Sequence, residues 1–287
     1  MCVRVRAFCH ETACLWEDRN EGSGGRRRRS IVGKCVGLAV TVVVLACAGI
    51  ALAGQAATNS RGDFIDLSVA VTPPVAGTAQ APQGVGIAFD SFTGNRVSAA
   101  NEGIGTSIVV RFNKGFKINS ALFPSCKINP TGLSKCAKST QIGTGAAEAE
   151  LAGANGAAPT FIPAKLIAYN GKPFKTKAPT IIFSALVNGK PTTELDFTVA
   201  QQPQGPYGLA FTEIQFPSAG GPSFGIAKFS VNVPDRTVAH KEGGKSVRVH
   251  LIEAPTTCKG SWVFAQTNTF TTGPPLTATD SQPCTKR

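Results

Sequence analysis

Three residues follow the chain order in which α/β hydrolases carry their catalytic triad. Ser223 lies in the pattern Gly221-Pro222-Ser223-Phe224-Gly225, and Asp235 and His240 come after it. In that chemistry the serine attacks, the histidine is the base and the aspartate orients the histidine. The pattern needs a sharp strand-to-helix turn, but a strand-like run follows Ser223, and the short spacing to Asp235 leaves no room for further strand–helix units. We therefore expect no catalysis here, and a secreted serine hydrolase using Ser223 stays an alternative.

His240, Glu242 and His250 could be ligands for a metal ion. His240 and Glu242 would share one face of a strand, because side chains alternate along it. The glycines at 243 and 244 indicate a hairpin turn, however, and two histidines alone do not complete a closed metal site. We expect exposed turn histidines, no metal and no cofactor.

Trp262 and Phe264 alternate on one strand-like run beside Cys258. Aromatic rings in such a row can stack on sugars. They more often anchor the core of a β-sandwich against a nearby disulfide. We expect both rings to be part of the core.

The first 57 residues have the order of an export signal. Arg26 to Arg29 precede a twenty-residue apolar run, 35–54, and small residues at Ala53 and Ala57 offer two cleavage sites. Positive charge is retained on the cytoplasmic side, so the remainder of the chain is expected to be translocated. The apolar run is also long enough to span a bilayer, so an uncleaved anchor is an alternative with the same topology. Cys47 and the paired arginines leave open a lipoprotein site and a twin-arginine signal.

The predicted organisation therefore has three parts. Residues 1–30 form a disordered leader or cytoplasmic tail, and residues 31–57 form a signal peptide or signal-anchor helix. Residues 58–287 form the exported domain. The alanine- and glycine-rich stretch at 152–160 is the one candidate for an internal boundary between two modules.

Cysteine usage agrees with export. Five of the nine cysteines precede residue 54, which leaves Cys126, Cys136, Cys258 and Cys284. An even number of cysteines outside the cell indicates two disulfides. Three pairings are open, and Cys126–Cys136 with Cys258–Cys284 is the most economical because each pair encloses one short segment. We expect structural disulfides and not reactive thiols.

The net charge of +12 falls to about +8 when the first 53 residues are removed. The remaining charges are scattered, and no basic run is interleaved with aromatic residues, so nucleic acid is not an expected partner. A mildly basic surface could still be attracted to acidic cell-wall polymers or to an anionic membrane surface.

Short β-rich runs between turn residues fill the chain after residue 63, with almost no helical periodicity. Asn170-Gly171 and Asn188-Gly189 are hairpin signals, because a type I′ turn needs positive φ at both central residues. Ten or more such runs predict an all-β fold, an antiparallel β-sandwich or a barrel, with two packed modules as a variant.

Several segments together resemble a group of uncharacterised secreted proteins from high-GC actinobacteria. They are Gly115-Phe116-Lys117-Ile118-Asn119, Phe123-Pro124-Ser125-Cys126, the run from Cys136 to Gly145, Cys258 to Phe264 and Asp280 to Cys284. Ala137 departs from the group, in which proline is common after the cysteine. The resemblance implies export, a β-rich fold and paired cysteines, and it implies no activity.

These observations favour an exported protein of the cell surface or exterior with a non-catalytic structural or binding role. The first alternative is a carrier of a glycan, a lipid or a small apolar ligand in the interior of the fold. The second is the serine hydrolase built on Ser223.

Overall fold

The computed structural model describes residues 56–95, 105–151, 160–214, 224–270 and 273–287. The leader, the apolar run at 35–54 and Ser223 lie outside these ranges, so the predictions made on them stay predictions. Within the ranges, no helix has the length and hydrophobicity that crossing a membrane requires.

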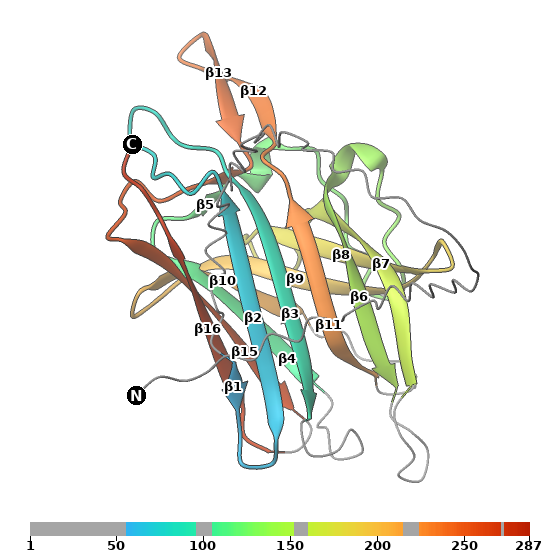
Figure 1. The fold of residues 1–287 in the computed structure, drawn as a ribbon. Coiled ribbons are helices and arrows are strands. Elements are labelled where there is room, and N and C mark those ends of the chain that lie inside the picture. The colour runs from blue at the N-terminus through green and yellow to red at the C-terminus, as the bar shows by residue number, and fades with distance from the viewer. Residues whose placement is uncertain (1–55, 96–104, 152–159, 215–223, 271–272) are drawn as a thin grey trace, which may run out of the picture. The chain divides into compact units, whose positions relative to one another are not determined.

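Most of the described chain is β-strand, and its few helical residues are two short 3-10 turns, η2 (Ser120–Leu122) and η3 (Lys138–Thr140). The predicted all-β class is therefore confirmed. Figure 1 shows the strands, which are β1 (Ala57–Thr58), β2 (Asp63–Thr72), β3 (Gly86–Asn95), β4 (Gly105–Asn113), β5 (Lys117–Ile118), β6 (Gln141–Leu151), β7 (Thr160–Gly171), β8 (Thr180–Val187), β9 (Lys190–Gln204), β10 (Tyr207–Ile214), β11 (Phe224–Val233), β12 (Thr237–Glu242), β13 (Lys245–His250), β14 (Ile252–Glu253), β15 (Ser261–Phe270) and β16 (Leu276–Pro283).

Twelve of these strands form one antiparallel sheet in the order β1-β2-β3-β11-β6-β7-β8-β9-β10-β4-β15-β16. The sheet curls until its two ends nearly meet, so it is a nearly closed barrel and not two separate sheets of a sandwich (Figure 1). β6 and β7, on either side of residues 152–159, pair with each other along their length.

The two ends of the sheet meet along β2 and β16, which run in the same direction. Val75 and Thr285, just beyond the two strands, form a parallel bridge. An odd number of long antiparallel strands brings parallel strands together at the closure, so a regular antiparallel ladder is excluded there. Side chains of β16 instead form hydrogen bonds with backbone groups of β2 at this closure.

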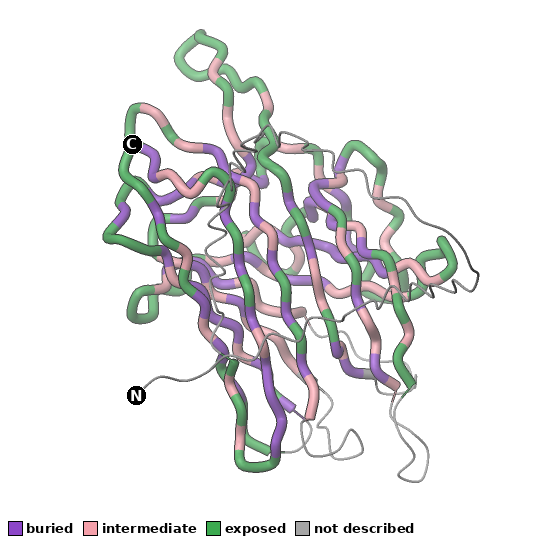
Figure 2. The backbone as a smooth tube through the Cα atoms, in the orientation of Figure 1, coloured by how far each residue is buried: buried purple, intermediate pink, exposed green. Residues whose placement is uncertain are grey.

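Strict alternation of side chains places the core on the inner side of the sheet. In β2, Ile65, Leu67, Val69 and Val71 are buried, while the residues between them are polar or small and more exposed (Figure 2). A sheet with one covered face is expected to alternate in this way. Most of the inward apolar side chains of the sheet form one large core cluster, and Ala147, Leu166 and Ala185 form a small second one.

One of the two hairpin predictions is confirmed and the other is wrong. Asn188 and Gly189 have φ of 52° and 75° and join β8 to β9 as a tight turn. Asn170 and Gly171 are instead the last residues of β7. Asn170 is buried there by the segment around Ser120, a contact between distant parts of the chain that a local turn signal does not reveal.

The predicted local disulfides, Cys126–Cys136 and Cys258–Cys284, are both present. Cys258 and Cys284 belong to the main core cluster together with Trp262 and Phe264, which are essentially inaccessible to solvent. The expectation that these two rings anchor the core is confirmed.

Candidate functional site

A cavity of about 70 Å³ lies inside the curled sheet. Its wall is apolar and aromatic, and its phenylalanines meet in tilted and edge-to-face pairs such as Phe112–Phe211, with ring centroids 4.8 Å apart. The lining residues are Ile87, Phe89, Val110, Phe112, Ile118, Ile142, Asn170, Ile181, Phe183, Phe197, Phe211, Phe229, Val231, Val233, Leu251 and Ile252.

Among the lining residues that the structure describes, Asn170 alone has a polar side chain, and its amide is fully engaged elsewhere. Its Nδ2 donates to the carbonyl oxygens of Ser120 and Pro124, both at 3.0 Å, and its Oδ1 accepts from Ser120 Oγ. A buried water needs two to four polar partners, and an apolar cavity without them stays dry. The cavity is therefore suited to an apolar guest.

The interior of the curled sheet becomes polar toward the C-terminal halves of β3 and β15. The inward row of β15 changes from Trp262 and Phe264 to Gln266 and Asn268, and the inward row of β3 ends with Ser91 and Thr93. A smaller hollow of about 30 Å³ lies among these polar residues. It adjoins the apolar cavity, because Phe89, Val110, Phe197 and Phe229 line both.

Gln266 has an unused acceptor at this polar end. Its Nε2 donates to Asn268 Oδ1 at 2.9 Å, while its buried Oε1 has no hydrogen-bond partner within the described part of the chain. Glu213 accepts a hydrogen bond from the Ile108 backbone, and burial raises the pKa of its carboxyl. An unpaired buried acceptor is costly, so a hydrogen-bond donor placed beside Gln266 would be stabilised.

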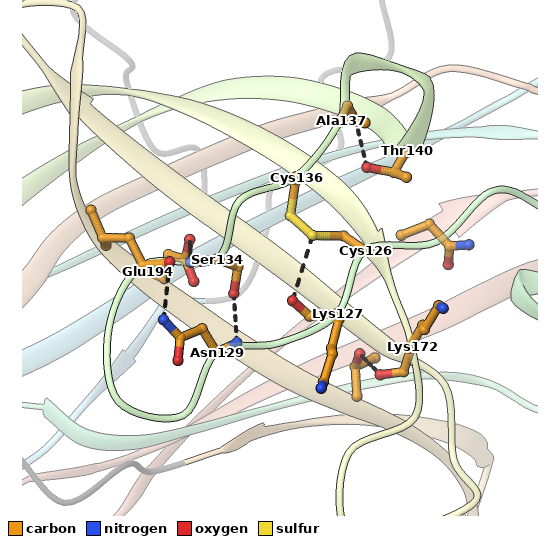
Figure 3. The surroundings of a disulfide bond; sticks show 12 residues. Cys126, Lys127, Asn129, Ser134, Cys136, Ala137, Thr140, Lys172 and Glu194 are labelled. Carbon is orange, nitrogen blue, oxygen red and sulfur yellow. Dashed lines mark hydrogen bonds between the residues drawn. A yellow bond between two sulfur atoms is a disulfide. The ribbon is translucent and has the colours of Figure 1, made fainter.

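The Cys126–Cys136 loop forms a second structured region on the outer face of β7 to β10 (Figure 3). The Cys126 backbone N–H donates to the Asn170 carbonyl at 2.8 Å, and the Ser134 backbone N–H donates to Glu194 Oε1 at 2.7 Å. These contacts fasten the loop at both ends. Ile182, which is fully buried, packs beneath it.

The loop region also contains a buried carboxyl group. Asp196 on β9 pairs across the sheet with Ile182 on one side and Ile214 on the other, and both isoleucines belong to the cluster under the loop. Burial, with a smaller contribution from the charge of Glu194, raises the pKa of Asp196 to about 7. Sequence reasoning missed Asp196, because an outward polar residue on a strand is normally solvated.

Of the three proposed catalytic residues, the structure describes Asp235 and His240, and it places them at different points of one hairpin. The Asp235 carboxylate contacts His250 Nδ1 at 2.9 Å, at the base of the β12–β13 hairpin. His240 lies further along that hairpin, opposite Val247. Ser223 lies outside the described residues.

The metal-ligand candidates are spread along the same hairpin. His240 and Glu242 share one face of β12, as alternation predicts, but His250 pairs with Thr237 and lies on the other face. Both His240 and Glu242 are exposed. Among the residues that the structure describes, no group of three acidic, histidine or cysteine side chains is placed to hold a metal ion.

No family model matches the chain, and neither a curated protein nor a solved structure matches it. The resemblance to secreted actinobacterial proteins therefore stays a prediction.

Proposed function

We propose that the protein is an exported, non-catalytic binding protein whose curled sheet holds a small, mainly apolar molecule. The cavity carries this proposal, because the described residues that line it are apolar apart from Asn170, whose side chain is already paired. Two disulfides support the export part, since such bonds persist in oxidising compartments.

The size and polarity of the interior restrict the ligand. A space of about 70 Å³ is far smaller than the roughly 300–1,000 Å³ of a drug-sized pocket. The ligand is therefore a small molecule or the end of an alkyl chain. The free Oε1 of Gln266 favours a ligand with one hydrogen-bond donor, such as a hydroxyl, at the polar end.

Titration of the secreted protein with short 1-alkanols, followed by NMR, tests this proposal. We expect the largest chemical-shift changes at the methyl and aromatic groups of the cavity lining, with saturation. Gln266→Leu should weaken 1-alkanol binding and leave binding of the alkane of equal length nearly unchanged. Absence of saturable shifts inside the sheet with every alkanol would overturn the proposal.

A further inference from the structure

Phe92 on β3 is an aromatic side chain that faces outward, away from the cavity. It is 44% exposed, although the inward neighbours Ser91 and Thr93 on the same strand are buried. The outward residues around it on β2 and β11 are mostly polar. A single exposed leucine is common on protein surfaces, but a large aromatic ring among charged side chains is unusual.

The sheet register places charged side chains on both sides of this ring. Asp66 of β2 and Lys228 of β11 lie directly opposite Phe92. Side chains in such positions have Cβ atoms about 4.5–5.5 Å apart. Asp90 lies two residues earlier on β3, about 7 Å away along the strand. Together with Ser68, these residues line a shallow hollow of about 250 Å³.

The charged groups of this hollow have no polar partner within the described part of the chain. The carboxylates of Asp66 and Asp90 and the ammonium of Lys228 make no side-chain hydrogen bond or ion pair with any residue that the structure describes. They therefore remain available to a ligand.

The ring itself is held in place. Phe64 packs against Phe92 with ring centroids 5.4 Å apart and an interplanar angle of 59°. Phe64 also covers Gly94, where a Cβ atom would come within 2.8 Å of its ring. A ring braced in this way loses little conformational freedom when a ligand stacks on it, which favours binding.

We infer that the Phe92 surface, defined as Asp66, Ser68, Asp90, Phe92 and Lys228, binds a neutral glycan. The apolar C–H face of a pyranose ring can stack on the phenyl ring. Carboxylates accept hydrogen bonds from sugar hydroxyls, and the lysine ammonium donates to sugar oxygens. The two carboxylates disfavour a polyanion such as a phosphate or uronate polymer, while Lys228 disfavours a polycation. This surface and the cavity lie on opposite faces of the sheet. An experiment can therefore disprove binding at one of them without affecting binding at the other.

Affinity electrophoresis of the secreted protein tests the inference. The gels contain dextran, soluble starch, laminarin, hydroxyethylcellulose or galactomannan as neutral polysaccharides, and polygalacturonate as the acidic comparison. The variants are Phe92→Ala and Asp66→Asn/Asp90→Asn. Phe161→Ala is the matched control, because Phe161 on β7 is 47% exposed but lies outside this surface. Thermal unfolding confirms that each variant is folded.

We expect retardation by at least one neutral polysaccharide, a loss of about tenfold in affinity for Phe92→Ala, a smaller loss for the double aspartate variant, and no change for Phe161→Ala. The inference is overturned if none of the neutral polysaccharides retards the protein, if Phe92→Ala and Phe161→Ala behave alike, or if only polygalacturonate is bound.

Discussion

The backbone N–H of Val69 donates a hydrogen bond to Asp280 Oδ2 at 2.6 Å, across a separation of 211 residues. Val71 and Gln282, which lie two residues further along β2 and β16, are bonded in a similar way. The Val71 N–H donates to Gln282 Oε1, and the Val71 carbonyl oxygen accepts from Gln282 Nε2 at 2.9 Å. Side chains of β16 thus satisfy backbone groups of β2 where the two parallel ends of the sheet meet without a ladder. The N-terminal end of the same edge is occupied by β1, which pairs with Phe64 and Ile65.

Asp280→Ala should destabilise the fold, because it leaves the buried Val69 N–H without an acceptor. An unsatisfied buried donor costs about 1–3 kcal/mol, so we expect the free energy of unfolding in urea to fall by that amount. Asp280→Asn keeps an acceptor oxygen and should lose less. Ser281→Ala, at the exposed neighbouring position, is the control and should leave the midpoint unchanged. Equal stability of the Asp280→Ala variant and the wild type would show that the closure does not depend on this bond.

Because of Asp196, the protein should be more stable in mild acid than at neutral pH. Burial raises its pKa to about 7, whereas an aspartate in the unfolded chain has a pKa of about 3.9. Between these values the folded protein keeps a proton that the unfolded chain has lost. The free energy of unfolding therefore falls as the pH rises from about 4 to about 7. Urea titrations at pH 5 and pH 7.5 measure the difference in the free energy of unfolding. We expect a difference of a few kcal/mol, because a shift of one pKa unit corresponds to about 1.4 kcal/mol.

Two variants separate Asp196 from the other carboxyl groups. Asp196→Asn removes the titrating group and should reduce the stability difference between the two pH values. Cys126→Ser/Cys136→Ser should reduce it as well, because a loosened loop lets water reach Asp196. An unchanged pH dependence in Asp196→Asn would contradict the assignment.

The mature N-terminus should be Gly54. Ala57 belongs to β1, pairs with Ile65 and packs against the core cluster. Cleavage after Ala53 leaves β1 whole, whereas cleavage after Ala57 removes half of it. The intact mass of the secreted protein decides this. A first residue of Thr58, or a chain that is never cleaved, would contradict the prediction.

The features that the sequence predicted correctly are local. The Asn188-Gly189 turn, the alternation of β2 and the two disulfides each depend on residues that are near one another in the chain. The order of the strands is not local, since β4 pairs with β10 and β15, which come about a hundred or more residues later. Nothing in the periodicity of a single strand identifies such partners.

Particular residues of the interior and of the loop region escaped prediction for the same reason. Asp196 and Asn170 are buried by segments distant in sequence, so strand alternation alone would leave Asp196 in solvent and turn propensity would place Asn170 in a hairpin. The register around Phe92 likewise depends on the pairing of β3 with β11. These two strands are neighbours in the sheet but are far apart in the chain. The apolar lining of the cavity could be foreseen as core, but the empty space within it could not.

Native mass spectrometry of the protein purified from the medium of the cells that produce it tests the central claim most directly. We expect the wild type to carry a small bound molecule that is released on denaturation. Val231→Phe, which fills the cavity, should lose it, and Val238→Phe on the exposed β12 strand should retain it. A wild-type mass equal to that of the polypeptide alone, or a bound mass that survives in Val231→Phe, would contradict the account.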